Sequence, residues 1–214
     1  MNLPVSDSFR LQIRLSVIDE RLYAAWQRWC GDLTFVEVQH GSIFDIAADA
    51  IVSPASSFVF MDGGIDRLYL ERFGTHLQDR VQAQIRTDHA GELLVGAATL
   101  VETGDAEIPW LIAAPTMRVP LPVDSTINAY LAARAIFLLI REGLIPAGNY
   151  AGQPVREQVK TVSIPGLGTG VGRMDPVRCA KQVRAALEDV VLGRFQFPGS
   201  TSQIRKRHDR LLGK

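Results

Sequence analysis

The stretch SIPGLGTGVGRMDP, residues 163–176, places four glycines at alternate positions directly after a short apolar run. Glycine loses more backbone entropy on folding than any other residue, so this density indicates that something comes close to the chain here. The run before it, QVKTVSIPG (158–166), has the composition of a strand, and DPVRCAKQVRAALEDVVLG (175–193) after it has the pattern of a helix. Asp175 is the predicted N-cap of this helix and Pro176 its first residue. The stretch therefore predicts a strand, a glycine loop and a helix.

Two common phosphate-binding patterns do not match this loop. A dinucleotide fingerprint would need a glycine where Val171 stands, and a Walker loop would need Lys and Ser or Thr where Arg173 and Met174 follow Gly172. Glycine-rich backbone between a strand and a helix can still present N–H groups to a diphosphate. The alternative is a plain tight connection, for which one or two glycines would suffice.

Strands and helices alternate along the rest of the chain. Alternating or continuous apolar runs predict strands at 10–18, 33–38, 97–104 and 110–116, and a short buried strand from residue 49 that breaks at Pro54 into a loop. Apolar stripes of helical spacing predict helices at 19–31, 75–86 and 124–143. Gly31 and Gly143 are the expected stops, and Asp124 or Ser125 is the expected N-cap of the last. Strands separated by helices favour an α/β fold with a largely parallel sheet covered on both faces.

Three segments that leave strand ends contain unusual residues: SPASSFVFMDGGID (53–66), PTMRVPLP (115–122) and GLGTGVG (166–172). Ligands of such sheets bind outside the carboxyl ends of the strands, so we expect these segments to meet in one crevice. Residues 144–157 are predicted to form a long surface loop. Residues 196–214 are predicted to be a basic tail appended to a single domain of residues 1–195.

Composition limits the function classes. The 214 residues have 47% hydrophobic content and zero net charge, which gives no bulk electrostatic reason to bind nucleic acid or an anionic membrane. The beginning of the chain lacks the apolar core of a signal peptide, and we expect a cytoplasmic protein. Cys30 and Cys179 lie on separate predicted helices and are expected to be reduced.

Other noteworthy side chains have ordinary explanations. His40, His76 and His89 show no metal-ligand spacing, so neither a metal nor a cofactor is predicted. Trp26 and Trp29 lie on one helical stripe and are predicted to belong to the core. The basic run RKRHDR (205–210) is either a solvated face or a contact for nucleic acid.

The segments DAIVSPAS (49–56) and MDGGID (61–66), followed about a hundred residues later by SIPGLGTGVG, resemble the macro domain family. That family usually has Asp-Ala-Ile-Val-Asn-Ala-Ala-Asn, then Gly-Gly-Gly-Val-Asp, then a Gly-Thr/Ser-Gly loop. The resemblance covers residues 33–195. It implies a three-layer α/β/α sandwich with a mixed, mostly parallel central sheet, and a cleft for ADP-ribose or its derivatives.

The resemblance also implies roles for particular residues. Asp66 matches the aspartate that orients or activates a water in hydrolytic members, and Ile43 would contact adenine through its backbone. Ser53 and Ser56 stand at the two asparagine positions near the terminal ribose. Arg118, beyond a strand end, either binds a phosphate or is a solvated loop arginine. The two loops around the diphosphate would be formed by Gly63, Gly64, Ile65 and Asp66, and by Gly166, Leu167, Gly168, Thr169, Gly170 and Val171.

Several positions depart from the family pattern. Ser42 replaces the aspartate that commonly reads the adenine amino group, so weaker adenine selection is expected. A serine hydroxyl at Ser53 or Ser56 cannot span the distance that an amide reaches. Asp62 stands where a third glycine is usual, and the aromatic common after the second loop is replaced by Gly172 or deleted.

Three functions follow from the sequence. The first is hydrolysis of an ADP-ribosyl bond to protein or nucleic acid, or of an acyl ester of ADP-ribose, with Asp66 activating a water. The second is a non-catalytic reader of ADP-ribose or a related nucleotide. The third is an assembly protein with a vestigial cleft. Without the resemblance, Asp66 could equally be an acidic residue placed favourably at a helix N-terminus.

Overall fold

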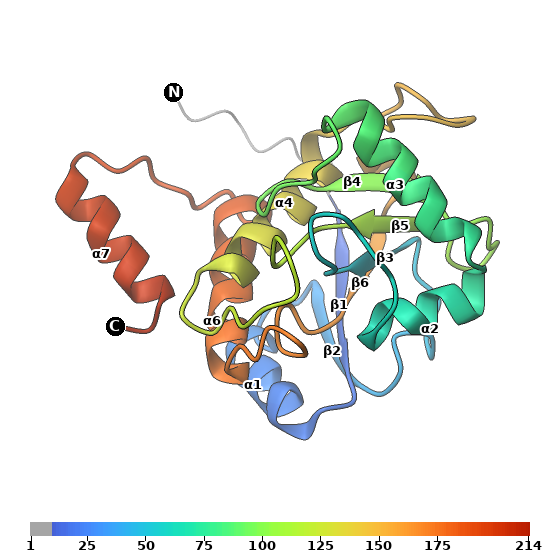
Figure 1. Ribbon diagram of the computed structural model, residues 1–214. Helices are drawn as coiled ribbons and strands as arrows, with labels where there is room; N and C mark the ends of the chain where they lie inside the picture. Colours follow the sequence, from blue (N-terminus) through green and yellow to red (C-terminus); the bar gives the residue numbers. More distant parts are fainter. Residues whose placement is uncertain (1–9) are drawn as a thin grey trace.

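The computed structural model describes residues 10–214 and contains one six-stranded sheet with the order β2-β1-β6-β3-β5-β4 (Figure 1). Neighbouring strands are parallel except at one edge, where β4 runs antiparallel to β5. The strands are β1 (Gln12–Val17), β2 (Val36–His40), β3 (Ala50–Ser53), β4 (Thr99–Glu102), β5 (Trp110–Ala113) and β6 (Thr161–Ile164). This is the mixed, mostly parallel sheet that the sequence predicts.

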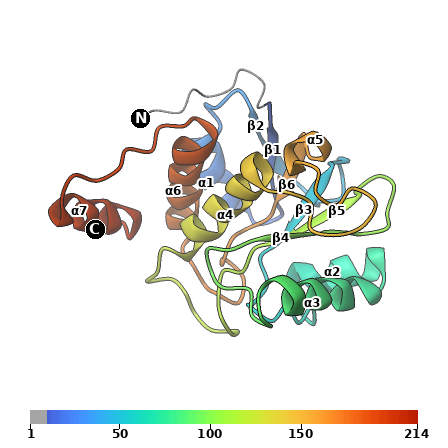
Figure 2. The same ribbon diagram turned by 90° about the horizontal axis from the view of Figure 1, so that it is seen from above.

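Helices cover both faces of the sheet, as Figure 2 shows from above. Successive side chains of the central strands β3 and β5 point to opposite faces of the sheet and enter two different cores. Val52 and Ile112 pack with α1, α4 and α6, whereas Ile51 and Leu111 pack with α2 and α3. The fold is therefore a three-layer α/β/α sandwich. The helices are α1 (Glu20–Cys30), α2 (Gly64–Phe73), α3 (His76–Asp88), α4 (Asn128–Glu142), α5 (Val155–Gln158), α6 (Pro176–Ala186), the π-helix η1 (Leu187–Val191) and α7 (Thr201–Leu211).

Most helix ends follow the sequence signals. The Asp175 side chain accepts a hydrogen bond from the Arg178 N–H at 3.0 Å, and Pro176 opens α6. Gly31 and Gly143 end α1 and α4. The predicted N-cap of α4 is wrong, because the helix begins only at Asn128.

The delayed start of α4 has a tertiary cause. The Val123 N–H donates to the Gly172 carbonyl at 2.7 Å, which ties the segment before α4 to the glycine loop. Thr126 then forms a turn: its Oγ1 donates to the Val123 carbonyl at 2.7 Å and accepts from the Asn128 N–H at 3.2 Å. This turn occupies the residues that would otherwise be the first turn of the helix.

The prediction of a long surface loop at 144–157 is wrong at both ends of that segment. Leu144 and Pro154 form an antiparallel bridge, and α5 begins at Val155. Ile145 and Val155 are buried against the α4 side of the core, because their side chains are apolar. The turn between them lies on the surface, as do Leu144, Arg156 and Glu157.

Candidate functional site

The three segments singled out in the sequence lie against one another at the carboxyl ends of β3, β5 and β6. Ser56 forms a parallel bridge with Met117, and Thr116 Oγ1 donates to the Pro54 carbonyl at 3.0 Å. A Cβ atom on Gly168 would lie 3.8 Å from the Thr116 Cβ, so the glycine loop touches the segment after β5. Because β3 is hydrogen-bonded between β5 and β6, the parallel topology brings these strand ends together.

Asp66 lies in the first turn of α2 and is buried, with 7% of its surface exposed. Ser53, the last residue of β3, donates a 2.5 Å hydrogen bond from Oγ to Asp66 Oδ1. The second oxygen, Oδ2, accepts no hydrogen bond from residues 10–214. Asp66 does not cap its helix, since Gly63 is at the N-cap position. Its carboxylate therefore has one fixed oxygen and one that is available to a ligand or a water.

The environment of Asp66 raises its pKa to about 6. Burial disfavours the charged form and is the largest cause; the hydrogen bond from Ser53 opposes it, and the nearby negative charge of Asp62 adds to it. A carboxyl group with a pKa close to neutrality can both hold and release a proton at physiological pH. The site thus contains a group suited to general acid–base chemistry.

The N-terminus of α2 presents free N–H groups. No side chain caps the helix at Gly63, and the amides of its first turn have no intrahelical acceptor. A Cβ atom on Gly63 or Gly64 would meet nothing within 4 Å, and Gly64 has a φ of +57°. Open space therefore lies over a set of donors at the positive end of a helix dipole, an arrangement that suits an anion.

In the glycine loop after β6, three of the glycine carbonyls accept backbone hydrogen bonds and the amides donate none to residues 10–214. The Gly168 carbonyl accepts from the Met174 N–H at 2.9 Å, and the Gly170 carbonyl accepts from the Arg173 N–H at 2.9 Å. Among the described residues, none accepts a hydrogen bond from the N–H groups of residues 166–172. The loop therefore presents a second set of backbone donors.

The close spacing of the four glycines has two different reasons. A Cβ atom would lie 2.9 Å from Leu22 Cδ2 at Gly166, 3.1 Å from Val123 Cγ2 at Gly168 and 2.5 Å from the Gly168 carbonyl oxygen at Gly172. These three positions need glycine because the loop packs tightly against its own chain. At Gly170 a Cβ atom would meet nothing within 4 Å. Both sequence interpretations, the tight connection and the exposed amides, thus describe part of the loop.

Other residues predicted for the site differ in their burial and in their partners. Ile43 is buried in the core beneath α2, Ile65 in the first turn of α2 is half-buried against that core, and Val171 is 60% exposed. Arg118 is committed elsewhere: its Nε and Nη2 donate to the two carboxylate oxygens of Glu92 at 2.7 and 3.2 Å. The Arg118 guanidinium thus forms an exposed ion pair, and the phosphate contact stays a prediction.

The start of the segment after β2 is held by side chain to backbone hydrogen bonds. Ser42 Oγ accepts from the Phe44 N–H at 3.2 Å, and Asp45 Oδ2 accepts from the Ser42 N–H at 2.8 Å. The exposed Asp45 thus places a carboxylate beside the position where the family aspartate is missing. Asp45 was not predicted from the sequence, although an acidic residue three positions after a serine is typical of such a reciprocal pair of bonds.

A second residue that sequence reasoning missed supports the Asp66 pair. Tyr69, one helical turn after Asp66, is fully buried and donates from its hydroxyl to the Val52 carbonyl at 2.9 Å. This bond joins α2 to β3 beside the Ser53–Asp66 bond, so the helix is fixed to the strand at two places. The spacing Asp66-x-x-Tyr69 on one helix face is the signal that could have indicated it.

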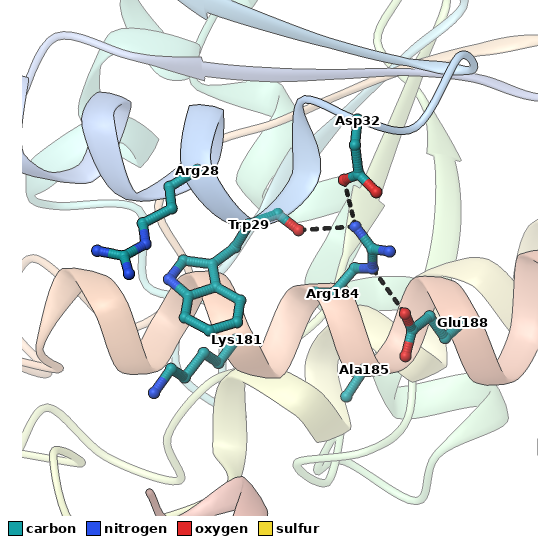
Figure 3. A pocket seen from close by; sticks show the side chains of 7 residues that line it. All are labelled: Arg28, Trp29, Asp32, Lys181, Arg184, Ala185 and Glu188. Carbon is teal, nitrogen blue, oxygen red and sulfur yellow. Dashed lines mark hydrogen bonds and ion pairs between the residues drawn. The ribbon is translucent and has the colours of Figure 1, made fainter.

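A separate hollow of about 390 Å³ lies between α1 and α6 (Figure 3). Arg28 and Lys181 lie over the Trp29 ring, 5.7 and 4.8 Å from its centroid. Trp26 is buried as predicted, but Trp29 is only half-buried because its ring lines this hollow. Arg184 hydrogen-bonds the Trp29 carbonyl at 2.9 Å and pairs with acidic side chains of the hollow's wall.

Two further properties concern the described residues as a whole. In residues 10–214, no helix is both long and apolar enough to cross a membrane. The same residues contain no group of three or more His, Cys, Asp or Glu side chains that could hold a metal ion. Cys30 and Cys179 are buried and free.

Comparison with known proteins agrees with this architecture. Residues 52–183 match the sequence model of the Macro domain. An uncharacterized protein of Aquifex aeolicus (strain VF5) is 31% identical over 155 residues, which are 72% of this chain and 80% of that protein.

Solved structures have the same fold at low sequence identity. The macrodomain of Mycobacterium tuberculosis DarG has a TM-score of 0.54 and 18% identity, covering 70% of this chain and 87% of the other. The Trypanosoma brucei macrodomain, in a crystal structure with ADP-ribose, has a TM-score of 0.50 and 17% identity, covering 70% and 56%. The match of residues 52–183 to the family model covers more than half of the sequence, and this chain belongs to the macro domain family.

Proposed function

We propose that this chain binds ADP-ribose or a related nucleotide diphosphate, with the phosphates between residues 63–66 and 166–171. The observation that carries the proposal is the pair of free backbone N–H sets at the ends of the neighbouring strands β3 and β6. Diphosphates are bound well by such donors at helix N-termini and in glycine loops. The crystal structure of the Trypanosoma brucei macrodomain with ADP-ribose supports the choice of ligand.

We further propose that the bound ligand is an ADP-ribosylated protein or nucleic acid, or an acyl ester of ADP-ribose, and that the chain hydrolyses it. In the first case, a water oxygen bonds to the ribose carbon while the bond from that carbon to the acceptor breaks. Asp66 takes one proton from the water, the acceptor leaves with the electron pair, and that proton is then passed to the acceptor, directly or through solvent, which returns Asp66 to its ionised form. The free Oδ2 and the raised pKa of Asp66 support this role.

Titration calorimetry with ADP-ribose tests the binding proposal. Gly170→Glu places a negative side chain in the open space over the loop amides, and binding should fall by at least about tenfold because like charges repel there. Gly170→Ala is the matched control, because its Cβ meets nothing within 4 Å, and it should bind like the parent. Equal binding by the Glu variant would show that the phosphates lie elsewhere.

Turnover of the parent and of Asp66→Asn tests the hydrolytic proposal. The assays measure release of ADP-ribose from modified protein or nucleic acid, and of acetate from acetylated ADP-ribose. Loss of a general base typically lowers the rate by about 10²–10⁴ with little change in affinity. A parent that binds ADP-ribose but turns over none of these substrates would be a reader. That alternative is favoured by the serines at Ser53 and Ser56, where amides are usual in the family.

A further inference from the structure

The zero net charge of the chain conceals a strong separation of charge. Residues 194–214 hold six of the 23 Lys and Arg residues and one of the 23 Asp and Glu residues. This C-terminal segment therefore carries a net charge of +5, and residues 1–193 carry −5. A basic segment of this kind on an acidic body is typical of a surface that binds a polyanion.

The C-terminal segment is an ordered element attached to the body. Its helix, α7, begins after Ser200, whose Oγ accepts from the Gln203 N–H at 3.3 Å. Arg207 pairs with the buried Asp189 of η1, and Gln182 Nε2 donates to the Leu211 carbonyl at 3.0 Å. Figures 1 and 2 both place α7 at one end of the molecule, beyond α6. The helix α7 is thus attached to the domain at Arg207 and Leu211.

Of the Lys and Arg residues in α7 and the three residues after it, only one is used for this attachment. Arg207 is half-buried, whereas Arg205, Lys206, Arg210 and Lys214 are exposed. None of these four forms an ion pair with a residue in the range 10–214. Three of these unpaired cations lie on α7 and Lys214 follows three residues after its end, so that several phosphates of one backbone can be contacted together.

Aromatic rings accompany these cations. Phe195 and Phe197, in the connection before α7, are 41% and 90% exposed. The Phe195 ring lies 5.2 Å from the Arg207 guanidinium, while Phe197 has a free face. A helix that binds a membrane would need an apolar stripe on its exposed face. Within α7, Ile204 is the only large apolar residue that is exposed, because Leu211 packs against the core. Cations beside exposed aromatic rings match single-stranded nucleic acid better.

We propose that residues 194–214 bind single-stranded nucleic acid, with Arg205, Lys206, Arg210 and Lys214 on its phosphates and Phe197 stacked on a base. This inference does not depend on the nucleotide site at the strand ends. It assigns to the chain a second binding surface, which would hold a nucleic-acid strand on the domain independently of ADP-ribose.

Fluorescence anisotropy of the full chain with a labelled oligothymidylate of about 20 nucleotides tests the proposal. Between about 50 and 200 mM salt, four phosphate contacts to a single strand should give a slope of log K against log salt of about −3. The variant Arg205→Glu/Lys206→Glu should reduce that slope by about half and weaken binding at least about tenfold. Phe197→Ala should weaken binding to the single strand about tenfold and binding to a duplex of the same length much less.

The matched control is Arg21→Glu/Arg86→Glu, which makes the same change of charge at two exposed residues of α1 and α3. It should bind the oligonucleotide within about threefold of the parent, because screened charges far from the contact contribute little. Equal losses in the control and the α7 variant would overturn the proposal, since net charge alone would then explain binding. Binding to phosphatidylserine-rich vesicles but not to the oligonucleotide would overturn it in favour of a membrane surface.

Discussion

Ser53 and Asp66 form a buried hydrogen bond of 2.5 Å that joins the end of strand β3 to the first turn of helix α2. This bond places a carboxyl group at the meeting point of the segments that leave the sheet. It also opposes the rise in the pKa of Asp66 that burial causes, because a hydroxyl donor favours the ionised form. Two residues thirteen positions apart in sequence therefore set the charge of the site together.

Removing the Ser53 hydroxyl should raise the pKa of Asp66 above its value of about 6. The ionised carboxylate would lose a donor while its burial stayed the same. The pKa is measured by ¹³C NMR titration of the Asp66 carboxyl carbon in Ser53→Ala. Ser56→Ala is the control, because the Ser56 side chain makes no hydrogen bond with residues 10–214. A lower or unchanged pKa in Ser53→Ala would contradict this account of the pair.

Asp66→Asn should stabilise the protein at pH 7 and not at pH 4. The folded-state pKa of Asp66, about 6, lies above its ordinary value of 3.8, so the unfolded chain releases this proton more readily. Wild-type stability therefore falls as pH rises from about 4 to about 6, by at most about 3 kcal/mol. The neutral amide avoids that loss. Urea unfolding at both pH values measures the difference, and the exposed Asp124→Asn should show none.

Gly63→Asp should separate stability from ligand binding. The residue stands at the N-cap of α2 with extended backbone and open space for a side chain, and aspartate is a better N-cap than glycine by a few tenths of a kcal/mol. The same carboxylate would occupy the positive end of the helix, where we propose that the diphosphate binds. The expected result is a slightly higher Tm together with a loss of at least about tenfold in ADP-ribose affinity.

Gly63→Ser provides the comparison for this experiment, because serine caps a helix without adding charge. It should keep most of the affinity while gaining similar stability. If both variants bound ADP-ribose as tightly as the parent, the α2 terminus would not be part of the nucleotide site.

Alanine substitutions in the glycine loop should differ sharply in their cost. Gly168 has a φ of +73°, and a Cβ atom there would lie 3.1 Å from Val123, so Gly168→Ala should lower the free energy of unfolding by about 1–3 kcal/mol. Gly170→Ala meets nothing and should be neutral or stabilising by less than about 1 kcal/mol. Urea unfolding of the two variants measures this; similar losses would contradict the packing described for the loop.

Features that depend on neighbouring residues in sequence were predictable. The cap at Asp175, the stop at Gly143 and the alternation of apolar residues in β1 each follow from local geometry, and the structure contains all three. The order of strands and helices then gives the layered fold, because parallel strands need crossover helices.

Features that depend on distant partners were not predictable in the same way. Arg118 pairs with Glu92, which is 26 residues away, and the half-exposed position of Trp29 depends on Lys181 of another helix. The start of α4 is set by the bond from Val123 to Gly172. In each case the local sequence allows several outcomes, and tertiary contact selects one.

The inward hydrogen bonds of the glycine loop also affect how a ligand would associate. Because the carbonyls of Gly168, Gly170 and Gly172 hold the loop in shape, its donors are preorganised and need not be ordered by the ligand. The conformational entropy of this segment is lost when the protein folds. Association should then resemble docking to a rigid surface, with little backbone movement between the free and the bound protein.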